Sequence, residues 1–173
     1  MSSVTRAAES VPVMWNNTNP SPANSAQRLK SEYYDLRAIC GETRIETDFG
    51  TVPARVLTDQ HRIRVLGGGF KAIVWVERLA LDEGFLVKHP DLRPLCIRAG
   101  MFRADVPRRD IFLSPYTMIC ANDGSPAVGR FGAAHRYATG TGGPAAGSNV
   151  REYVVIGCAG PALIRAEGMW LSC

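Results

Sequence analysis

Histidine is scarce in this chain, and its cysteines do not occur at the spacing of a metal site. Only three histidines, His61, His89 and His135, are present among 173 residues. The five cysteines are odd in number and widely separated, without any Cys-x-x-Cys pair. A zinc site is therefore not expected, and we expect neither a metal nor an organic cofactor. Cysteines in apolar surroundings also favour unpaired thiols and a reducing, cytoplasm-like setting.

Long apolar segments are absent as well. No apolar run approaches the length that spans a membrane. Residues 1–6 lack the apolar stretch of a classical signal peptide. We therefore expect no membrane association and a cytoplasmic location, with secretion by a non-classical route as the alternative.

The chain also lacks a strong excess of one charge. Its net charge of +4 and pI of about 8.9 are only mildly basic. Positive charge gathers in one stretch with acidic residues interleaved, namely Arg98, Arg103, Asp105, Arg108, Arg109 and Asp110. Such mixing is typical of a solvated or internally paired loop, rather than of a phosphate-binding patch. We therefore expect no nucleic-acid partner.

The composition fits one domain behind a separate N-terminal region. A hydrophobic content of 46% is enough for one packed core. Residues 1–24 are rich in Ser, Asn, Pro and Ala, which predicts a flexible arm. Leu29, Tyr33 and Leu36 recur at i, i+4 and i+7, which predicts a short helix over residues 25–37. We divide the chain into this arm and helix, residues 1–39, and a β domain, residues 40–173.

From Cys40 onward the pattern predicts short strands joined by turns. Thr43–Thr47 alternates polar and apolar residues, and Asp48–Gly50 supplies a hairpin turn before a return strand over Thr51–Leu57. His61–Leu66 also alternates, which predicts one buried and one exposed face. Further strands are predicted over Phe70–Val76, Leu95–Ile97, Ile111–Leu113, Met118–Cys120, Glu152–Gly157 and Ala162–Ala166, with turns at Gly67–Gly69 and Asn122–Gly124 and a loop over 139–149. Many short strands separated by turns indicate an all-β domain.

Four blocks of this β region carry a resemblance to a known family. They are Gly41–Pro53 (GETRIETDFGTVP), Phe70–Val76 (FKAIVWV), Leu92–Pro115 with its two parts LRPLCIRAG and RRDIFLSP, and Leu163–Gly168 (LIRAEG). In this order they resemble bacterial hedgehog/intein (Hint) domains, which open with a Gly-Thr-x-Ile-x-Thr-x-x-Gly hairpin and close with a Leu-Leu-Ala-Glu-Gly strand. The resemblance implies a horseshoe of short antiparallel strands and hairpins.

The same resemblance implies self-processing chemistry at the start of the domain. In Hint domains the first residue, usually cysteine, attacks the carbonyl of the preceding residue, and the amide becomes a thioester. A histidine polarises the scissile amide and protonates the leaving nitrogen. Cys40 would be the nucleophile here and Ile39–Cys40 the scissile bond. The chain's own N-terminal segment, residues 1–39, is then the candidate substrate.

The chain departs from the family pattern at several positions. Thr117 stands where family members carry a histidine after the Ser-Pro pair, so it enters the set of candidate site residues. Cys40 directly precedes Gly41, whereas the family has several residues between its nucleophile and the Gly-Thr pair. Pro161 lies near the place of a late-strand histidine, and no terminal His-Asn is present. Full protein splicing is therefore not expected.

Three histidines and one aspartate are candidates to replace the missing histidine. His135, which lies beyond the Ser-Pro segment, is the best of the three histidines. His61 lies on an alternating strand, which favours a surface position, and His89 precedes Pro90 in a loop. Asp110 could orient a catalytic partner, although its neighbours Arg108 and Arg109 favour a local ion pair.

Three hypotheses follow from the sequence. The first is a Hint-fold domain that cleaves itself at Cys40, which would make it an autocatalytic enzyme. The second is a Hint-fold domain with degenerate chemistry that acts as a structural or interaction module, for which an unknown protein partner is possible. The third is an unrelated all-β binding module. The missing histidines favour the second over the first, and the surroundings of Cys40 discriminate between them.

Overall fold

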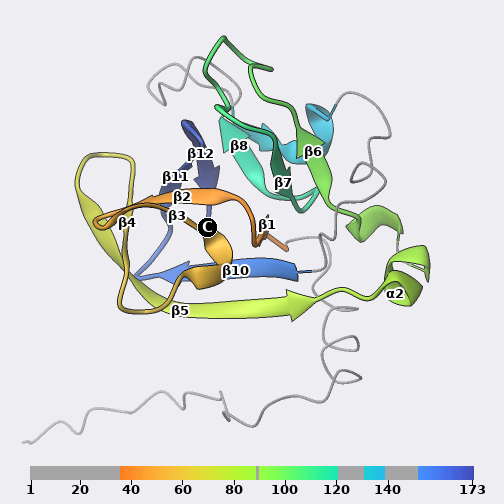
Figure 1. Ribbon diagram of the computed structural model, residues 1–173, viewed down its shortest axis with the longest axis horizontal. Coiled ribbons are helices and arrows are strands. Elements are labelled where there is room, and N and C mark those ends of the chain that lie inside the picture. The colour runs from red at the N-terminus through yellow and green to blue at the C-terminus, as the bar shows by residue number, and fades with distance from the viewer. Residues whose placement is uncertain (1–35, 89, 121–130, 139–151) are drawn as a thin grey trace, which may run out of the picture.

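The described residues of the computed structural model form an all-β domain (Figure 1). The structure describes residues 36–88, 90–120, 131–138 and 152–173. The strands are β1 (Ile39–Cys40), β2 (Arg44–Thr47), β3 (Gly50–Pro53), β4 (Arg62–Arg64), β5 (Phe70–Ala80), β6 (Leu95–Ile97), β7 (Ile111–Leu113), β8 (Met118–Cys120), β9 (Phe131–Ala133), β10 (Glu152–Cys158), β11 (Leu163–Ala166) and β12 (Met169–Ser172). Helical turns are α2 (Glu83–Lys88), η2 (Ala54–Val56), η3 (Pro90–Leu92) and η4 (Ala134–Arg136).

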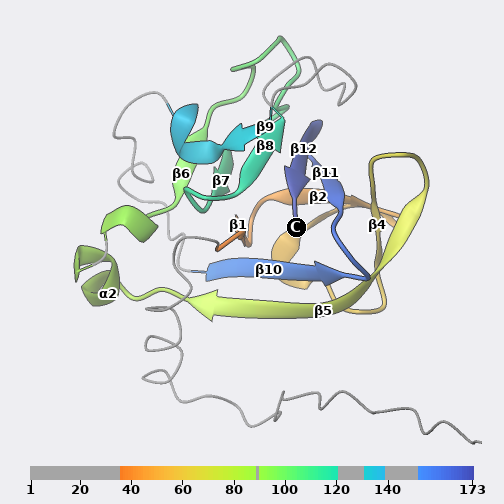
Figure 2. The same cartoon turned by 180° about the vertical axis from the view of Figure 1, so that it is seen from behind.

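The strands form a curled antiparallel sheet (Figures 1 and 2). Neighbouring strands follow the order β6-β7-β1-β10-β5-β4-β2-β11-β12-β8-β9, and β3 pairs with β2. The long strands β5 and β10 run side by side as a ribbon along one edge of the molecule (Figure 1). The all-β prediction is therefore confirmed. Among the described residues, no helix has the length and apolar character needed to cross a membrane.

Aliphatic side chains from most strands meet in one core cluster. They include Ile45, Ile63, Ile97, Ile111, Leu113, Ile119, Val154, Ile164 and Leu171, all nearly inaccessible to solvent. On β2 and β4 these buried residues alternate with more exposed charged ones, as the period of a strand requires. Burial of such side chains supplies most of the driving force for folding, at roughly 25 cal/mol for each Å² of apolar surface.

Several predicted strands are confirmed and others are corrected. The hairpin of β2 and β3 turns at Asp48 and Phe49 as predicted, and the glycines of the Gly67–Gly69 turn all have positive φ. The return strand ends at Pro53 rather than at Leu57. The chain turns into η2 there because the Ala54 N–H donates to the Thr43 carbonyl at 2.8 Å, which buries Ala54.

Other differences between prediction and structure concern elements in which polar and apolar residues do not clearly alternate. Strand β12 was not predicted because Met169, Trp170 and Leu171 are all buried, so no polar residue marks a second face. Strands β1 and β9 and helix α2 were also missed. The predicted helix lies outside the described residues apart from Leu36 and Arg37, which have no regular structure. The turn at Asn122–Gly124 and the loop over 139–149 lie outside them as well.

A close aromatic contact tests the register in which β5 pairs with β10. Gly157 lies opposite Trp75, and a Cβ added at Gly157 would come within 2.1 Å of the indole ring. Gly157→Ala should therefore lower the free energy of unfolding by about 1–3 kcal/mol. In a Trp75→Ala background the same change should cost less, because the ring is absent. Urea unfolding of the four variants measures this coupling, and equal costs in both backgrounds would contradict the contact.

Candidate active site

The start of the domain is built into the sheet as an interior strand. Strand β1 lies between β10 and β7, with Ile39 opposite both Val154 and Leu113. Cys40 lies opposite Tyr153 and is 1% exposed. The Ile39–Cys40 peptide is therefore part of a strand with neighbours on both sides.

The thiol of Cys40 lies in a small apolar cluster. Its companions are Ala38, Leu81, Leu86 and Tyr153. Burial raises the pKa of the Cys40 thiol well above its ordinary value. Burial, and then the proximity of Cys40, raises the pKa of Tyr153, whose hydroxyl donates to the Leu92 carbonyl at 2.9 Å. These surroundings favour a neutral thiol, whereas a cysteine nucleophile reacts as the thiolate.

Two buried hydroxyl groups hold the backbone just before β1. We call Ser114 and Thr117 the hydroxyl clamp; both are fully buried. Ser114 follows β7 and Thr117 precedes β8, and the Thr117 N–H donates to the Ser114 carbonyl at 3.2 Å. The short turn between them brings both side chains to the same stretch of chain, residues 36–38. The clamp therefore joins segments that lie more than 70 residues apart.

The hydrogen bonds of the clamp satisfy the backbone around Ala38. The Ala38 N–H donates to Thr117 Oγ1 at 3.1 Å and to Ser114 Oγ at 3.3 Å. The Thr117 hydroxyl donates to the Ala38 carbonyl at 2.9 Å, and the Ser114 hydroxyl donates to the Leu36 carbonyl. The Ser114 N–H donates to the Ala38 carbonyl at 2.8 Å. The two hydroxyl oxygens are also hydrogen-bonded to each other at 2.9 Å, and both accept the Ala38 N–H, so the N–H of the Arg37–Ala38 amide is held in place.

His135 lies close to the clamp segment but outside it. Its ring Nδ1 is 3.1 Å from the Pro115 carbonyl, and its backbone N–H donates to the same oxygen at 3.0 Å. The ring is exposed and meets Tyr116 edge-on at 6.1 Å between ring centroids. Within the described part of the chain, no hydrogen bond links His135 to Cys40 or to Thr117. Its catalytic role therefore stays a prediction.

Asp110 lies beside the turn that follows β6 and not beside Cys40. Its Oδ1 accepts the Ala99 N–H at 2.8 Å, so it closes the turn after β6. Burial, followed by the Asp110 charge, raises the pKa of Cys96, which places Asp110 beside that cysteine rather than beside Cys40. The ion pair expected with Arg108 or Arg109 is not formed. Arg108 instead points towards Glu46, with 3.8 Å between Nη1 and Oε1.

Of the remaining histidines, the structure describes His61, which lies in a turn away from the hydroxyl clamp. His61 accepts from the Thr58 N–H at 3.2 Å and meets Phe49 edge-on, in a partly exposed turn. This agrees with the predicted surface position. His89 lies outside the described residues. Among those residues, no group of three or more His, Cys, Asp or Glu side chains could hold a metal ion.

The sequence interpretation missed Ser114 and Ala38 as parts of this site. The family pattern points to the place two residues after the Ser-Pro pair, which is Thr117, and not to Ser114 itself. A usable signal was present, because hydroxyl residues three apart across a proline turn can approach one another. The structure brings Thr117 together with Ser114 and Ala38, and it does not bring Cys40 together with His135 or Asp110.

Comparison with known proteins gives one match. A family model described as Hint domain matches residues 38–172, which is most of the chain. No curated protein and no solved structure matches the chain.

Removal of one hydroxyl tests the clamp. Thr117→Val keeps the side-chain shape but removes one of the two acceptors of the Ala38 N–H and one of the two donors to the Ala38 carbonyl. We expect a loss of about 1–3 kcal/mol in the free energy of unfolding, since buried backbone groups lose a partner. Thr51→Val, at an exposed position of β3, is the matched control. If urea unfolding gives the same small change for both variants, the clamp does not stabilise the domain.

Alkylation rates test the state of Cys40. At pH 7.5 the raised pKa keeps this thiol protonated, and the cluster shields it. We expect N-ethylmaleimide to modify Cys40 more than about tenfold more slowly than half-buried Cys96, with the Cys40 rate rising only at alkaline pH. Peptide mapping by mass spectrometry after timed quenching measures both rates. A Cys40 that reacts fastest at neutral pH would instead indicate an activated nucleophile.

Proposed function

We propose that this chain, which belongs to the Hint domain family over residues 38–172, does not cleave itself and acts as a structural or interaction module. In this proposal its self-processing chemistry is degenerate. The N-terminal segment then stays attached to the domain.

The observation that carries the proposal is the amide held by Thr117. In the family pattern a histidine at this place acts on the scissile amide. Here the Thr117 hydroxyl accepts the Ala38 N–H at 3.1 Å, so the amide at that place is Arg37–Ala38. The residue after this bond is alanine, whose methyl group cannot attack a carbonyl. A threonine hydroxyl is also a poor acid and base at neutral pH, so neither half of the chemistry is present there.

The position of Cys40 supports the same proposal. Cys40 lies two residues after Ala38, which directly precedes β1, and at the rise of a strand their backbone positions are about 6.6 Å apart. Reacting atoms need to lie about 3–3.5 Å apart in a productive geometry. The Cys40 side chain also packs with Leu81, Leu86 and Tyr153, which include neither a base nor a cation. Attack by Cys40 on the clamped amide is therefore disfavoured by distance and by protonation.

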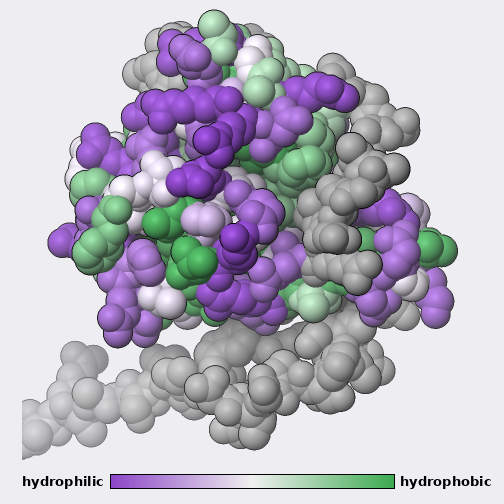
Figure 3. Space-filling view, viewed as in Figure 1, coloured by the Kyte–Doolittle hydropathy of each residue, from purple (hydrophilic) through white to green (hydrophobic). Residues whose placement is uncertain are grey.

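An interaction role is supported by the apolar side chains left on the surface. Phe49 is 77% exposed at the β2–β3 turn, and Val74 and Trp75 are about half exposed on β5. The face seen in Figure 3 is mainly hydrophilic, with small groups of hydrophobic residues among the hydrophilic ones. Exposed aromatic residues of this kind are common where proteins meet partners.

Intact mass spectrometry tests the proposal directly. The purified full chain is measured before and after incubation with dithiothreitol or hydroxylamine, both of which open thioesters. We expect an unchanged full-length mass. Loss of residues 1–39 in the wild type, abolished by Cys40→Ala, would overturn the proposal and establish cleavage at Ile39–Cys40.

A gain-of-function variant serves as the positive control for this experiment. Ala38→Cys combined with Thr117→His restores a thiol and an imidazole at the clamped amide. Nucleophile-dependent loss of residues 1–37 from this variant would support the assignment of the Arg37–Ala38 bond. Loss of residues 1–39 would contradict it. Circular dichroism checks that the double variant folds. Ala38→Cys alone, with Thr117 unchanged, is the smaller change and is measured beside it.

A further inference from the structure

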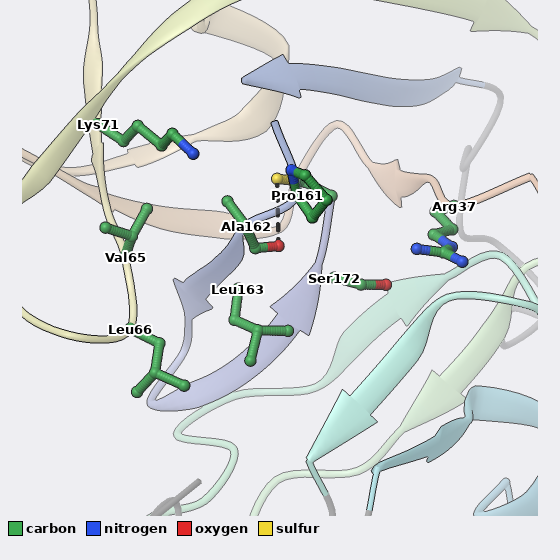
Figure 4. A pocket seen from close by; sticks show the side chains of 9 residues that line it. Arg37, Val65, Leu66, Lys71, Pro161, Ala162, Leu163 and Ser172 are labelled. Atoms are coloured by element: carbon green, nitrogen blue, oxygen red, sulfur yellow. Dashed lines mark hydrogen bonds between the residues drawn. The ribbon is translucent and has the colours of Figure 1, made fainter. Parts of the chain in front are cut away.

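Two thiols that self-processing does not involve lie next to each other at the far end of the β5–β10 ribbon. The sulfur atoms of Cys158 and Cys173 are 3.8 Å apart. Both residues are partly exposed, unlike Cys40. Cys173 lines a pocket of about 380 Å³ together with Lys71, Ala162 and Ser172 (Figure 4). A small molecule can therefore approach the pair.

The sheet topology brings these residues together. Cys158 ends β10, and the hairpin of β11 and β12 returns the chain to the same place. The Cys173 N–H donates to the Ala162 carbonyl at 3.2 Å, and its thiol lies 3.5 Å from the same oxygen, the contact drawn as a dashed line in Figure 4. The sulfurs are thus held near each other by backbone hydrogen bonds. Formation of a disulfide, with an S–S bond of about 2.05 Å, requires the side chains to close the gap by rotation.

We propose that Cys158 and Cys173 form an oxidation site, which closes to a disulfide by exchange with a small disulfide such as oxidised glutathione. In the first step the Cys158 thiolate attacks one sulfur of the small disulfide and releases one thiolate. In the second step the Cys173 thiolate attacks the Cys158 sulfur and releases the second thiolate. The two protein thiols are oxidised, the small disulfide is reduced to two thiols, and their two protons pass to these products.

The electrostatics of the pair favour this order of steps. Burial, together with the charge and hydrogen bond of Cys158, raises the pKa of Cys173 to about 12, while Lys71 lowers it. In the mixed disulfide Cys158 no longer has an ionisable thiol, so its charge no longer raises the pKa of Cys173. Burial still raises that pKa and Lys71 still lowers it. Formation of the mixed disulfide therefore removes one of the causes that oppose ionisation of Cys173 before the second step.

The disulfide would link the end of β12, which lies near the hydroxyl clamp, to the end of β10. Ser172, next to Cys173, accepts the Met118 N–H on its side-chain oxygen at 3.2 Å, and Leu171 lies opposite Ile119 on β8. Met118 directly follows Thr117 of the clamp. A bond from Cys173 to Cys158 therefore limits opening of the strand that lies against β8.

Mass spectrometry of the native full chain tests the oxidation site. After incubation with oxidised glutathione at pH 8, we expect a mass lower by two hydrogen atoms, with Cys158 and Cys173 protected from alkylation and joined in one peptide. The melting temperature should rise by about 5–10 °C and return to its starting value with dithiothreitol.

Single substitutions separate the two steps. Cys173→Ser should stop at a stable glutathione adduct on Cys158, and Cys158→Ser should lose the two-hydrogen change. Cys96→Ser, at a half-buried cysteine outside the pair, should behave as wild type. Persistence of a glutathione adduct in the wild type, pairing with Cys96, or absence of reaction in the folded chain would each overturn the proposal.

Discussion

The insertion of β1 between β7 and β10 is the constraint on which the rest of the structure depends. This two-residue strand joins the part of the sheet that contains β6 and β7 to the long β5–β10 ribbon. So short an element offers few ladder hydrogen bonds of its own. The hydroxyl clamp compensates by holding the backbone immediately before it, with Ser114 and Thr117 satisfying buried donors and acceptors around Ala38. The entry of the chain into the domain is thus fixed by side-chain hydroxyls.

The hydrogen bonds of the hydroxyl clamp also bear on the proposed loss of self-processing. Under the assignment proposed above, this amide corresponds to the one that a self-processing Hint domain polarises and breaks, which needs a proton donor and a nucleophile beside it. Thr117 and Ala38 provide a hydroxyl and a methyl group, which stabilise the amide without activating it. In the proposed function, this position serves as a structural anchor and not as a reactive site. Such an exchange is physically reasonable, because a fully satisfied buried polar network rigidifies its surroundings.

Burial and neighbours give the cysteines of this chain different properties. Cys40 lies in an apolar cluster, where desolvation favours the neutral thiol. Cys158 and Cys173 are partly exposed and lie within contact distance of each other, and Cys158 contributes to the raised pKa of Cys173. Reactivity in this protein therefore depends on local environment more than on position in the sequence. The cysteine that opens the domain is the better shielded one, and the pair at its end is the more accessible.

The sequence by itself determined the all-β class, the family resemblance and most strand positions, because alternation and turn residues act over a few neighbouring positions. The β2–β3 hairpin, β7, β8 and β11 are examples. Only the tertiary structure decided which amide Thr117 meets, since Ala38 lies 79 residues away and strand order brings them together. The burial of Cys40 and the pairing of Cys158 with Cys173 have the same origin. Contacts between distant segments depend on sheet order and register, which no local pattern in the chain specifies.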